Sequence, residues 1–407
     1  MAKKSIDPID EPTQKKASGA AHMKNTKPFT SLVAIGAILF GLGVLSTYAP
    51  YSFAHSHPKS PSKTAHKTAA HKKTKTYKAQ SPGYDMPELT SVNRGVNAIL
   101  SASAIYWKPQ QDEFYVGVTG PRPGAEQKIC DFHSHYQPGF KAGIGLSTSY
   151  DSWSLFLEYT RLKTHDTTSK YSNTDHPIIM SPWVGMTVAD QGLYNPTNSN
   201  VTNQLLSSDV SNSWRLKFNM FDLSLARSYY VGKKLVFNPF LAARGAVINQ
   251  HLSVDFSYKV RSQPSVESTI YSHNKNITQQ IGPRLGLDMS WLIGSNFRFG
   301  GTLAAGLLYT QYYLIHRETL DNVEHANVHY NPHAFRFNCD AAVQFGWRIF
   351  NARHRKYCDV FFKYEAISFW QQNMVSGLTT SLNDQGKKQQ DGNLYLQGGT
   401  FNLAFNF

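Results

Sequence analysis

From about residue 90 onward, apolar and polar residues alternate along the chain. The clearest stretch runs from Phe335 to Ile349, where the odd-numbered positions are apolar and the even-numbered positions are polar or small. Successive side chains of a strand point to opposite faces, so this stretch predicts a strand with one apolar face. A helix would distribute both classes around its axis and does not fit the pattern.

The same alternation predicts ten strands. They cover residues 96–108, 138–149, 152–164, 213–231, 234–258, 279–293, 297–315, 333–350, 357–373 and 391–407. Short connections alternate with long ones, and the long ones are 109–137, 165–212, 259–278, 316–332 and 374–390. Alternating strands joined in this way are typical of a transmembrane β-barrel with tight turns at one end and extended loops at the other.

Two details of this assignment stay open at the level of sequence. The strand 213–231 changes the phase of its apolar positions at Met220-Phe221, which we interpret as a β-bulge. The connection 165–212 is long enough to contain two more strands near 180–188, so we expect 10 to 14 strands. Mean hydropathy is −0.40 although 13% of the residues are aromatic, as an antiparallel barrel requires.

Residues 1–54 have the order of an N-terminal extension followed by a secretory signal. Lys24 and Lys27 precede an apolar stretch at 32–45, and small residues then predict cleavage after Ala54. Met23 is an alternative start. The competing interpretation is an uncleaved inner-membrane anchor, although the apolar stretch is short for a helical span.

Residues 55–90 are expected to form a disordered linker between the signal and a barrel at 91–407. Positions 55–80 carry seven lysines and no acidic residue, and they account for half of the net charge of +14. Because the charge is concentrated in one segment of low hydrophobicity, a nucleic-acid partner is not expected. Loose metal binding by the linker histidines is the alternative to a solvated basic tether. The histidines are His55, His57, His66 and His71.

The C-terminal residues form a further specific signal. Phe401, Leu403, Phe405 and Phe407 are alternate apolar positions that end on an aromatic residue. This resembles the C-terminal strand signature of outer-membrane proteins, which the barrel-assembly machinery recognises. Together with the export signal, it places the chain in the bacterial outer membrane.

Short motifs distributed over residues 95–407 resemble the major outer membrane protein family of Legionella and of chlamydia-related bacteria. They are Ala104–Pro109, Pro138–Gly143, Trp153–Lys163 with Thr164-His165, Trp214–Lys217 with Asp222-Leu223, Asn238–Phe240 with Arg244-Gly245 and Ile248, and Gly282–Leu287. The resemblance implies a surface-exposed, pore-forming barrel. The three cysteines cannot supply the cross-linking network of the chlamydial members, and the lysine-rich linker is not a feature we associate with the family.

The charged positions assigned to the inner face are the candidate pore-lining residues. They are Lys141, Glu158, Arg215, Lys217, Asp222, Arg284, Asp288, Arg298, Arg336, Asp340, Arg348, Asp359, Lys363 and Glu365. Mixed charge of this kind is typical either of a hydrated channel with weak anion preference or of ion pairs that fill a narrow barrel.

The sequence therefore predicts a porin-like channel for passive diffusion of small hydrophilic solutes. The alternative is a structural barrel or adhesin that acts through its extracellular loops. The expected partners are outer-membrane lipid, the assembly machinery and small solutes, and a homo-oligomer is left open. No catalytic residue, cofactor or metal site is expected, since the spacing of Cys130, His133 and His135 lacks a fourth ligand.

Overall fold

The structure is a computed structural model. It describes residues 96–119, 128–148, 152–164, 167–171, 178–191, 193, 205–231, 234–293, 296–351, 356–375 and 392–406. The predicted signal with its cleavage at Ala54, the linker and Phe407 lie outside the described residues.

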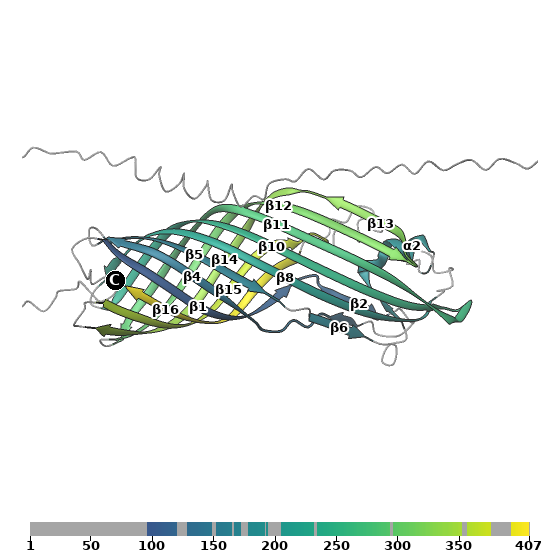
Figure 1. The fold of residues 1–407 in the computed structure, drawn as a ribbon, viewed down its shortest axis with the longest axis horizontal. Helices are drawn as coiled ribbons and strands as arrows, with labels where there is room; N and C mark the ends of the chain where they lie inside the picture. Colours follow the sequence, from purple (N-terminus) through teal and green to yellow (C-terminus); the bar gives the residue numbers. More distant parts are fainter. Residues whose placement is uncertain are drawn as a thin grey trace, which may run out of the picture.

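Ten long strands form one closed antiparallel ring in the described part of the chain (Figure 1). They are β1 (Val96–Gln111), β4 (Gln137–Thr148), β5 (Trp153–Lys163), β8 (Leu205–Arg227), β10 (Leu235–Val260), β11 (Gln263–Ile293), β12 (Phe297–Leu320), β14 (His333–Asn351), β15 (Lys356–Asn373) and β16 (Gly392–Asn406). Each strand pairs with the next, and β16 closes the ring on β1, with Leu100 opposite Phe405. The predicted barrel of about ten strands is confirmed.

Smaller elements gather at the end of the barrel away from the C-terminus of β16, here called the distal end (Figure 1). They are a three-stranded sheet of β2 (Tyr115–Thr119), β3 (Ile129–Asp131) and β7 (Ile179–Met180), and the single strands β6 (Thr167–Tyr171) and β13 (Val323–Tyr330), which pair with the barrel wall. The short strand β9 (Tyr229–Val231) lies at the other end, since it pairs with the start of β10.

The connection 165–212 does contain two short strands, β6 and β7, although most of the stretch 180–188 is helical. Residues 182–184 form a 3₁₀ turn, η1 (Pro182–Val184), which continues into the short helix α2 (Gly185–Asp190). Pro182 fits this start because its fixed backbone angle suits the first turn of a helix. No helix of the described residues is long and apolar enough to cross a membrane.

Two of the predicted long loops are wrong, because the strands continue through them as hairpins. Strands β10 and β11 stay paired up to Val260 and Gln263, so 259–278 is a tight hairpin rather than a loop. Strands β12 and β13 are joined through Asp321 and Asn322, both with positive φ. Two consecutive left-handed residues make a type I′ turn, whose twist matches that of the strands, and Asp and Asn tolerate this conformation.

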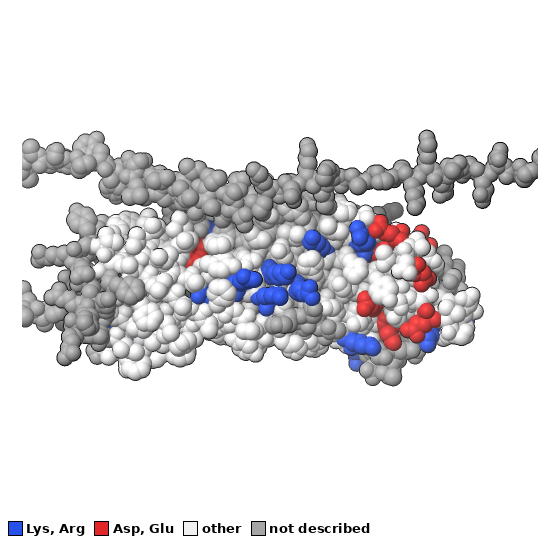
Figure 2. All heavy atoms as spheres, viewed as in Figure 1, with Lys and Arg blue, Asp and Glu red and all other residues white. Residues whose placement is uncertain are grey.

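The outer wall has an apolar belt over the part of the barrel nearest the start of β1 and the end of β16. Leu285, Leu303, Phe335 and Trp347 are among its exposed side chains. A tilted strand needs about 9–11 residues to cross a membrane. Strands β10 and β11 have 26 and 31 residues, so their distal parts continue well beyond the belt. Lys, Arg, Asp and Glu gather over this distal part in the view of Figure 2, while the opposite part is almost without charge.

The predicted orientation of the distal half of β8 is wrong. Trp214, Leu216 and Phe218 are buried inside the barrel, whereas Arg215 and Lys217 are exposed on its outer wall. The register with β10 is unbroken from Ala226 to Ser207, so no bulge lies at Met220-Phe221. The alternation of inward and outward side chains continues without a break along β8. Outside the barrel, however, lipid gives way to water toward the distal end. The outward side chains are therefore apolar in the part that faces lipid and polar in the part that faces water.

Candidate functional site in the barrel lumen

Arg244 lies at the centre of the lumen. Its guanidinium is 2% exposed and reaches Asp222 through two parallel bonds, Nε to Oδ1 at 2.7 Å and Nη2 to Oδ2 at 2.8 Å. Nη1 also donates to Asp340 Oδ1 at 2.8 Å and to the Asn338 side-chain oxygen. Such a two-pronged contact fixes the geometry of both partners, because the guanidinium fork matches a carboxylate.

Several of these contacts bridge the lumen rather than follow the wall. Arg244 belongs to β10 and Asp340 to β14, which are three places apart in the ring. Arg284 on β11 donates Nε to Asp340 Oδ2 at 2.6 Å, so one carboxylate holds two arginines from different strands. Asp288 on the same strand accepts a hydrogen bond from the Thr302 hydroxyl on β12.

A second bridge starts from Lys141 on β4. Its Nζ lies 3.0 Å from Glu365 on β15, again three places apart in the ring, and 3.6 Å from Glu158. Glu365 also accepts a 2.6 Å hydrogen bond from Thr400, whose hydroxyl accepts one from the Trp107 indole at 3.1 Å. Lys141 stands 5.0 Å from the centre of the Trp107 ring, a cation–π distance.

A third group lies toward the end of the barrel where β1 starts and β16 ends. Asp359 accepts bonds from Arg348 Nε and Nη2, both at 2.7 Å, and from Arg298 Nη2 at 3.2 Å. Arg348 also stacks 3.8 Å from the Tyr357 ring centre. The lumen charges are therefore largely paired with one another, which lowers the cost of holding them out of bulk water.

These charges surround a small polar chamber of about 180 Å³. It is lined by both bridging clusters and by Lys363, Asp288 and Phe156. A barrel of eight strands is just wide enough for side chains to fill it, and ten strands widen it only a little. The chamber has room for a few water molecules, which polar walls of this kind can hold.

An apolar layer lies on the distal side of the chamber. Phe218 on β8 and Phe369 on β15 are fully buried, and their ring centres are 5.6 Å apart. These strands are five places apart in the ring of ten and so face each other across the barrel. The two rings therefore meet across the full width of the lumen.

Distal segments of the chain add to this layer. Phe114 packs its ring 5.5 Å from Trp183 and 5.2 Å from Trp214, and Phe132 packs 5.8 Å from Trp214. We call Phe114, Phe132 and Trp183 the distal plug. Its rings come from residues outside the barrel strands and pack on the inward-facing Trp214 of the wall.

Glu318 anchors the helix beside this plug. Its carboxylate accepts hydrogen bonds from the Thr187 amide at 2.6 Å and from the Met186 amide at 3.3 Å. On the other side, Oε1 lies 2.9 Å from His316 Nε2, and His316 Nδ1 lies 2.6 Å from the Asn274 side-chain oxygen. The amides in the first turn of α2 have no acceptor within the helix, and a carboxylate of the barrel wall accepts their hydrogen bonds.

Most of the candidate pore-lining residues do point inward. Those placed inside the barrel are Lys141, Glu158, Asp222, Arg284, Asp288, Arg298, Asp340, Arg348, Asp359, Lys363 and Glu365. Arg336 is also part of the interior network, through its 3.0 Å bond to the Tyr312 hydroxyl. Arg215 and Lys217 are exposed outside and are removed from the set. That the others line an open pore stays a prediction.

Arg244 is the charged residue of the described site that the sequence did not assign to the lumen. Its neighbours Ala243 and Gly245 are too small to mark a face, so the middle of its strand is ambiguous. The even-numbered positions from Leu252 to Phe256 are buried, and extending that phase back along β10 places Arg244 inside. Thr400 and Trp107 were missed because they carry no charge.

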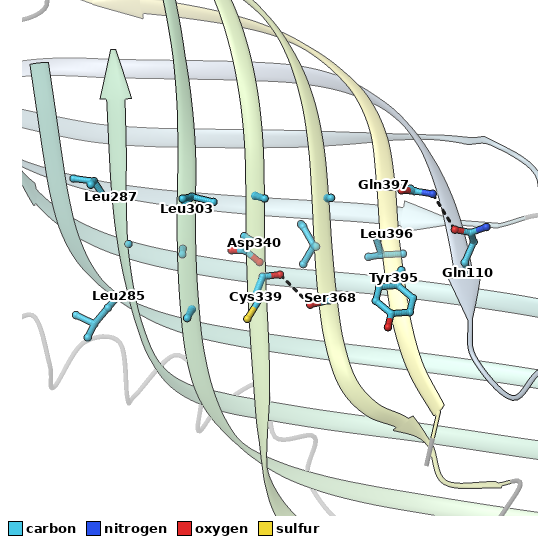
Figure 3. A pocket seen from close by; sticks show the side chains of 16 residues that line it. Gln110, Leu285, Leu287, Leu303, Cys339, Asp340, Ser368, Tyr395, Leu396 and Gln397 are labelled. Atoms are coloured by element: carbon cyan, nitrogen blue, oxygen red, sulfur yellow. Dashed lines mark hydrogen bonds between the residues drawn. The ribbon is translucent and has the colours of Figure 1, made fainter. Parts of the chain in front are cut away.

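The larger hollow, about 900 Å³, lies on the outer wall and not in the lumen (Figure 3). Leu285 and Leu303 border it on one side, and Tyr395 and Gln397 on the other. Small side chains such as Ala341 and Ala366 form its floor. Because Leu285 and Leu303 belong to the apolar belt, this groove faces the surroundings of the barrel and cannot hold a solute in the lumen.

The sequence spacing of Cys130, His133 and His135 does not form a cluster in the structure. Cys130 is buried within the three-stranded distal sheet, while both histidines are exposed. In the described part of the chain, no group of three His, Cys, Asp or Glu residues is arranged to hold a metal ion.

A closed ten-stranded barrel with an apolar belt outside and paired charges inside is typical of outer-membrane proteins. A sequence model of the family described as Legionella pneumophila major outer membrane protein precursor matches residues 94–407. The chain belongs to this family. It is an outer-membrane β-barrel protein, and both the resemblance drawn from the motifs and the expected localisation are confirmed.

Among solved structures, two outer-membrane proteins match the chain at low similarity. The outer membrane protease OmpT of Escherichia coli is 12% identical, with 80% of this chain and 100% of that chain covered and a TM-score of 0.39. A major outer membrane protein of Thermus thermophilus is 8% identical, covering 77% of this chain and 99% of that chain, with a TM-score of 0.27. At these values the similarities carry no argument about activity. No curated protein matches the sequence.

Proposed function

We propose that this protein is a sealed outer-membrane barrel that acts as a structural, surface-presenting element through its distal part. The observation that carries the proposal is the contact between Phe218 and Phe369, which joins opposite walls of the lumen. The bridges from Arg244 to Asp340 and from Lys141 to Glu365 cross the lumen on the side of this contact that is farther from the distal end. All three contacts cross the lumen and narrow any hydrated path for solutes.

The size of the distal part supports this proposal. Strands β10 and β11 continue as a paired hairpin beyond the apolar belt, and the interior there is packed with buried side chains such as Phe256 and Ile270. A well-packed interior is the mark of a folded domain rather than of an open vestibule. On the cell surface, such a domain presents its hairpins and strand ends to other molecules.

Passive diffusion, as a porin performs it, is the second candidate. It is favoured by the polar chamber of about 180 Å³, whose walls carry both signs of charge. In this alternative the structure is a closed state, and the distal plug opens together with the Phe218–Phe369 contact. Charge rings in a widened lumen would then set the selectivity.

Conductance of the purified protein in planar bilayers separates the two candidates. The sealed barrel predicts no stepwise conductance at any applied voltage up to bilayer breakdown. Insertion is verified in the same preparation by faster gel migration before heating, which reports an intact barrel. Regular unitary steps from the unmodified protein would overturn the sealed barrel and favour the porin. A double variant, Phe218→Ala with Phe369→Ala, serves as the comparison with a weakened seal.

A further inference from the structure

A belt of basic side chains lies on the outer wall of the barrel. Arg161 and Lys163 on β5, Arg215 and Lys217 on β8, and Lys275 on β11 point outward, and we call these five residues the basic belt. Figure 2 shows Lys and Arg side chains gathered on the middle of the wall, between the uncharged part and the acidic distal end.

The pairing of the strands places one pair of these like charges directly opposite each other and two more on either side of a histidine. Lys163 is the register partner of Lys217. Arg215 is opposite His251, and His251 is opposite Lys275 on its other side. Like charges in opposite positions of neighbouring strands destabilise a sheet. The barrel therefore bears a local electrostatic cost that an anionic partner would remove.

Three lysines of the belt receive little compensation from the residues that the structure describes. Among the described residues, Lys163, Lys217 and Lys275 form no ion pair with a carboxylate. The outward-facing Asp255 lies four residues beyond His251 along β10. At about 3.3 Å per residue, that is more than a hydrogen-bond length along the strand.

The position of the belt indicates which anion it meets. The rings of Tyr159 and Phe221, with centres 4.6 Å apart, lie two residues from Arg161 on β5 and four from Lys217 on β8, on the side of the apolar belt. Aromatic side chains of this kind mark the interface between lipid chains and headgroups. The basic belt therefore stands at the height of the headgroups of the surrounding leaflet.

We propose that the basic belt binds the phosphate groups of a phosphorylated glycolipid headgroup in the membrane leaflet at the distal edge. A phosphomonoester carries about 1.5 to 2 negative charges and several acceptor oxygens, which suit convergent Lys and Arg donors. Basic residues near a membrane surface each strengthen binding to anionic lipid. The inference rests on the location in the outer membrane and is independent of whether the lumen conducts.

The test uses the full mature protein in neutral detergent micelles, with diphosphoryl lipid A as the probe. Binding is followed as the rise in the temperature at which the fast-migrating folded band is lost. The variant is Lys163→Gln, Lys217→Gln and Lys275→Gln combined. The control is Lys259→Gln, Arg261→Gln and Arg317→Gln combined, which removes equal charge from exposed distal positions, two of them in surface ion pairs.

We expect lipid A to raise the transition temperature of the wild type and of the control at similar concentrations. The belt variant should need about 100-fold more lipid, since three charges are lost. Enzymatically dephosphorylated lipid A and inorganic phosphate should have little effect. Without lipid, the belt variant should be at least as stable as the wild type, because the opposed like charges are gone.

The proposal would be overturned if the belt variant and the control needed the same lipid A concentration for the same rise in transition temperature. An equal response to dephosphorylated lipid A would overturn it as well, since this would indicate binding through acyl chains alone. If inorganic phosphate reproduced the effect, the lipid would not be the occupant. The single variant Lys217→Gln, which relieves only the pair with Lys163, keeps the test open if the triple variant does not fold.

Discussion

Phe218 and Phe369 face each other from opposite strands of the barrel, and their rings meet in the middle of the lumen. Their strands are five places apart in the ring of ten, so the rings can meet only when the sheet is curled into a barrel. Their contact therefore reports both the closure of the barrel and the packing of its interior.

Replacing either ring with Ala should destabilise the barrel by roughly 3–5 kcal/mol, because the surrounding walls cannot collapse into the space. The two substitutions should also be coupled by about 0.5–1.5 kcal/mol in a double-mutant cycle, as for other aromatic pairs. Urea unfolding in micelles measures both quantities. The control is a second cycle that combines Phe218→Ala with Phe362→Ala, because Phe362 lies on the lipid-facing wall and does not touch Phe218. Strict additivity for Phe218 and Phe369 would show that the rings do not pack together.

Arg244 gives a second prediction about the lumen. Its removal by Arg244→Met leaves Asp222 and Asp340 buried without their shared cation, which should cost about 3–5 kcal/mol in unfolding experiments. Adding Asp222→Asn should recover part of the loss, because Asp222 is then neutral, while Asp340 keeps its bond to Arg284.

The control for this prediction is Arg317→Met on the outer wall. Arg317 forms an exposed ion pair with Glu324, and such pairs contribute at most about 1 kcal/mol. A similar loss for both arginine variants would mean that the lumen network does not stabilise the barrel more than a surface pair does.

The strands of the ring were predictable because each segment shows the alternation of apolar and polar residues by itself, without reference to its neighbours. Which face points inward was not predictable, because this depends on what surrounds the barrel at each height. On β8, Phe218 and Asp222 share the inner face although one is apolar and the other charged. A single rule of apolar outward and polar inward therefore assigned Arg215 and Lys217 to the wrong side.

The lumen site was predictable only in its parts. The charges of β14, such as Asp340, were placed inside because lipid faces the opposite side of that strand along most of its length. Their partners were not predictable, because Arg244 and Asp340 are brought together by the curvature of the ring and not by sequence. The cross-lumen contact of Phe218 with Phe369 depends on the strand count and the closure of the ring as well.

The height of the membrane on the outer wall can be tested with arginine substitutions. Val343 lies exposed in the middle of the apolar face of β14, and Ser253 points outward on the distal part of β10. Val343→Arg should cost about 2–4 kcal/mol in lipid vesicles, since a cation near the bilayer midplane is costly on a barrel wall. Ser253→Arg should change stability little. Comparable costs for the two variants would contradict the proposed boundary between lipid and water.

Cys130 should behave as a protected thiol at the cell surface. Burial raises the pKa of this thiol above its ordinary value, and the neighbouring Asp131 raises the pKa further. Because the thiolate is the reactive form, labelling of intact cells with a maleimide should be slow at neutral pH and should accelerate as the pH rises. Asp131→Asn should shift this profile to lower pH. A profile unchanged by that substitution would argue against electrostatic control by Asp131.

Gly398 tests the seam where the last strand meets the first. It has a φ of +156°, and a Cβ atom built there would collide with the Tyr106 carbonyl oxygen on β1. Gly398→Ala should therefore strain the backbone and push β16 away from β1, lowering the unfolding temperature in micelles and slowing barrel closure. The neighbouring Gly399 has open space around its Cβ position, so Gly399→Ala is the matched control. Both substitutions add one methyl group to the same strand. If they lowered the unfolding temperature equally, the close approach of Gly398 to Tyr106 would not be what determines the stability of the contact between β16 and β1.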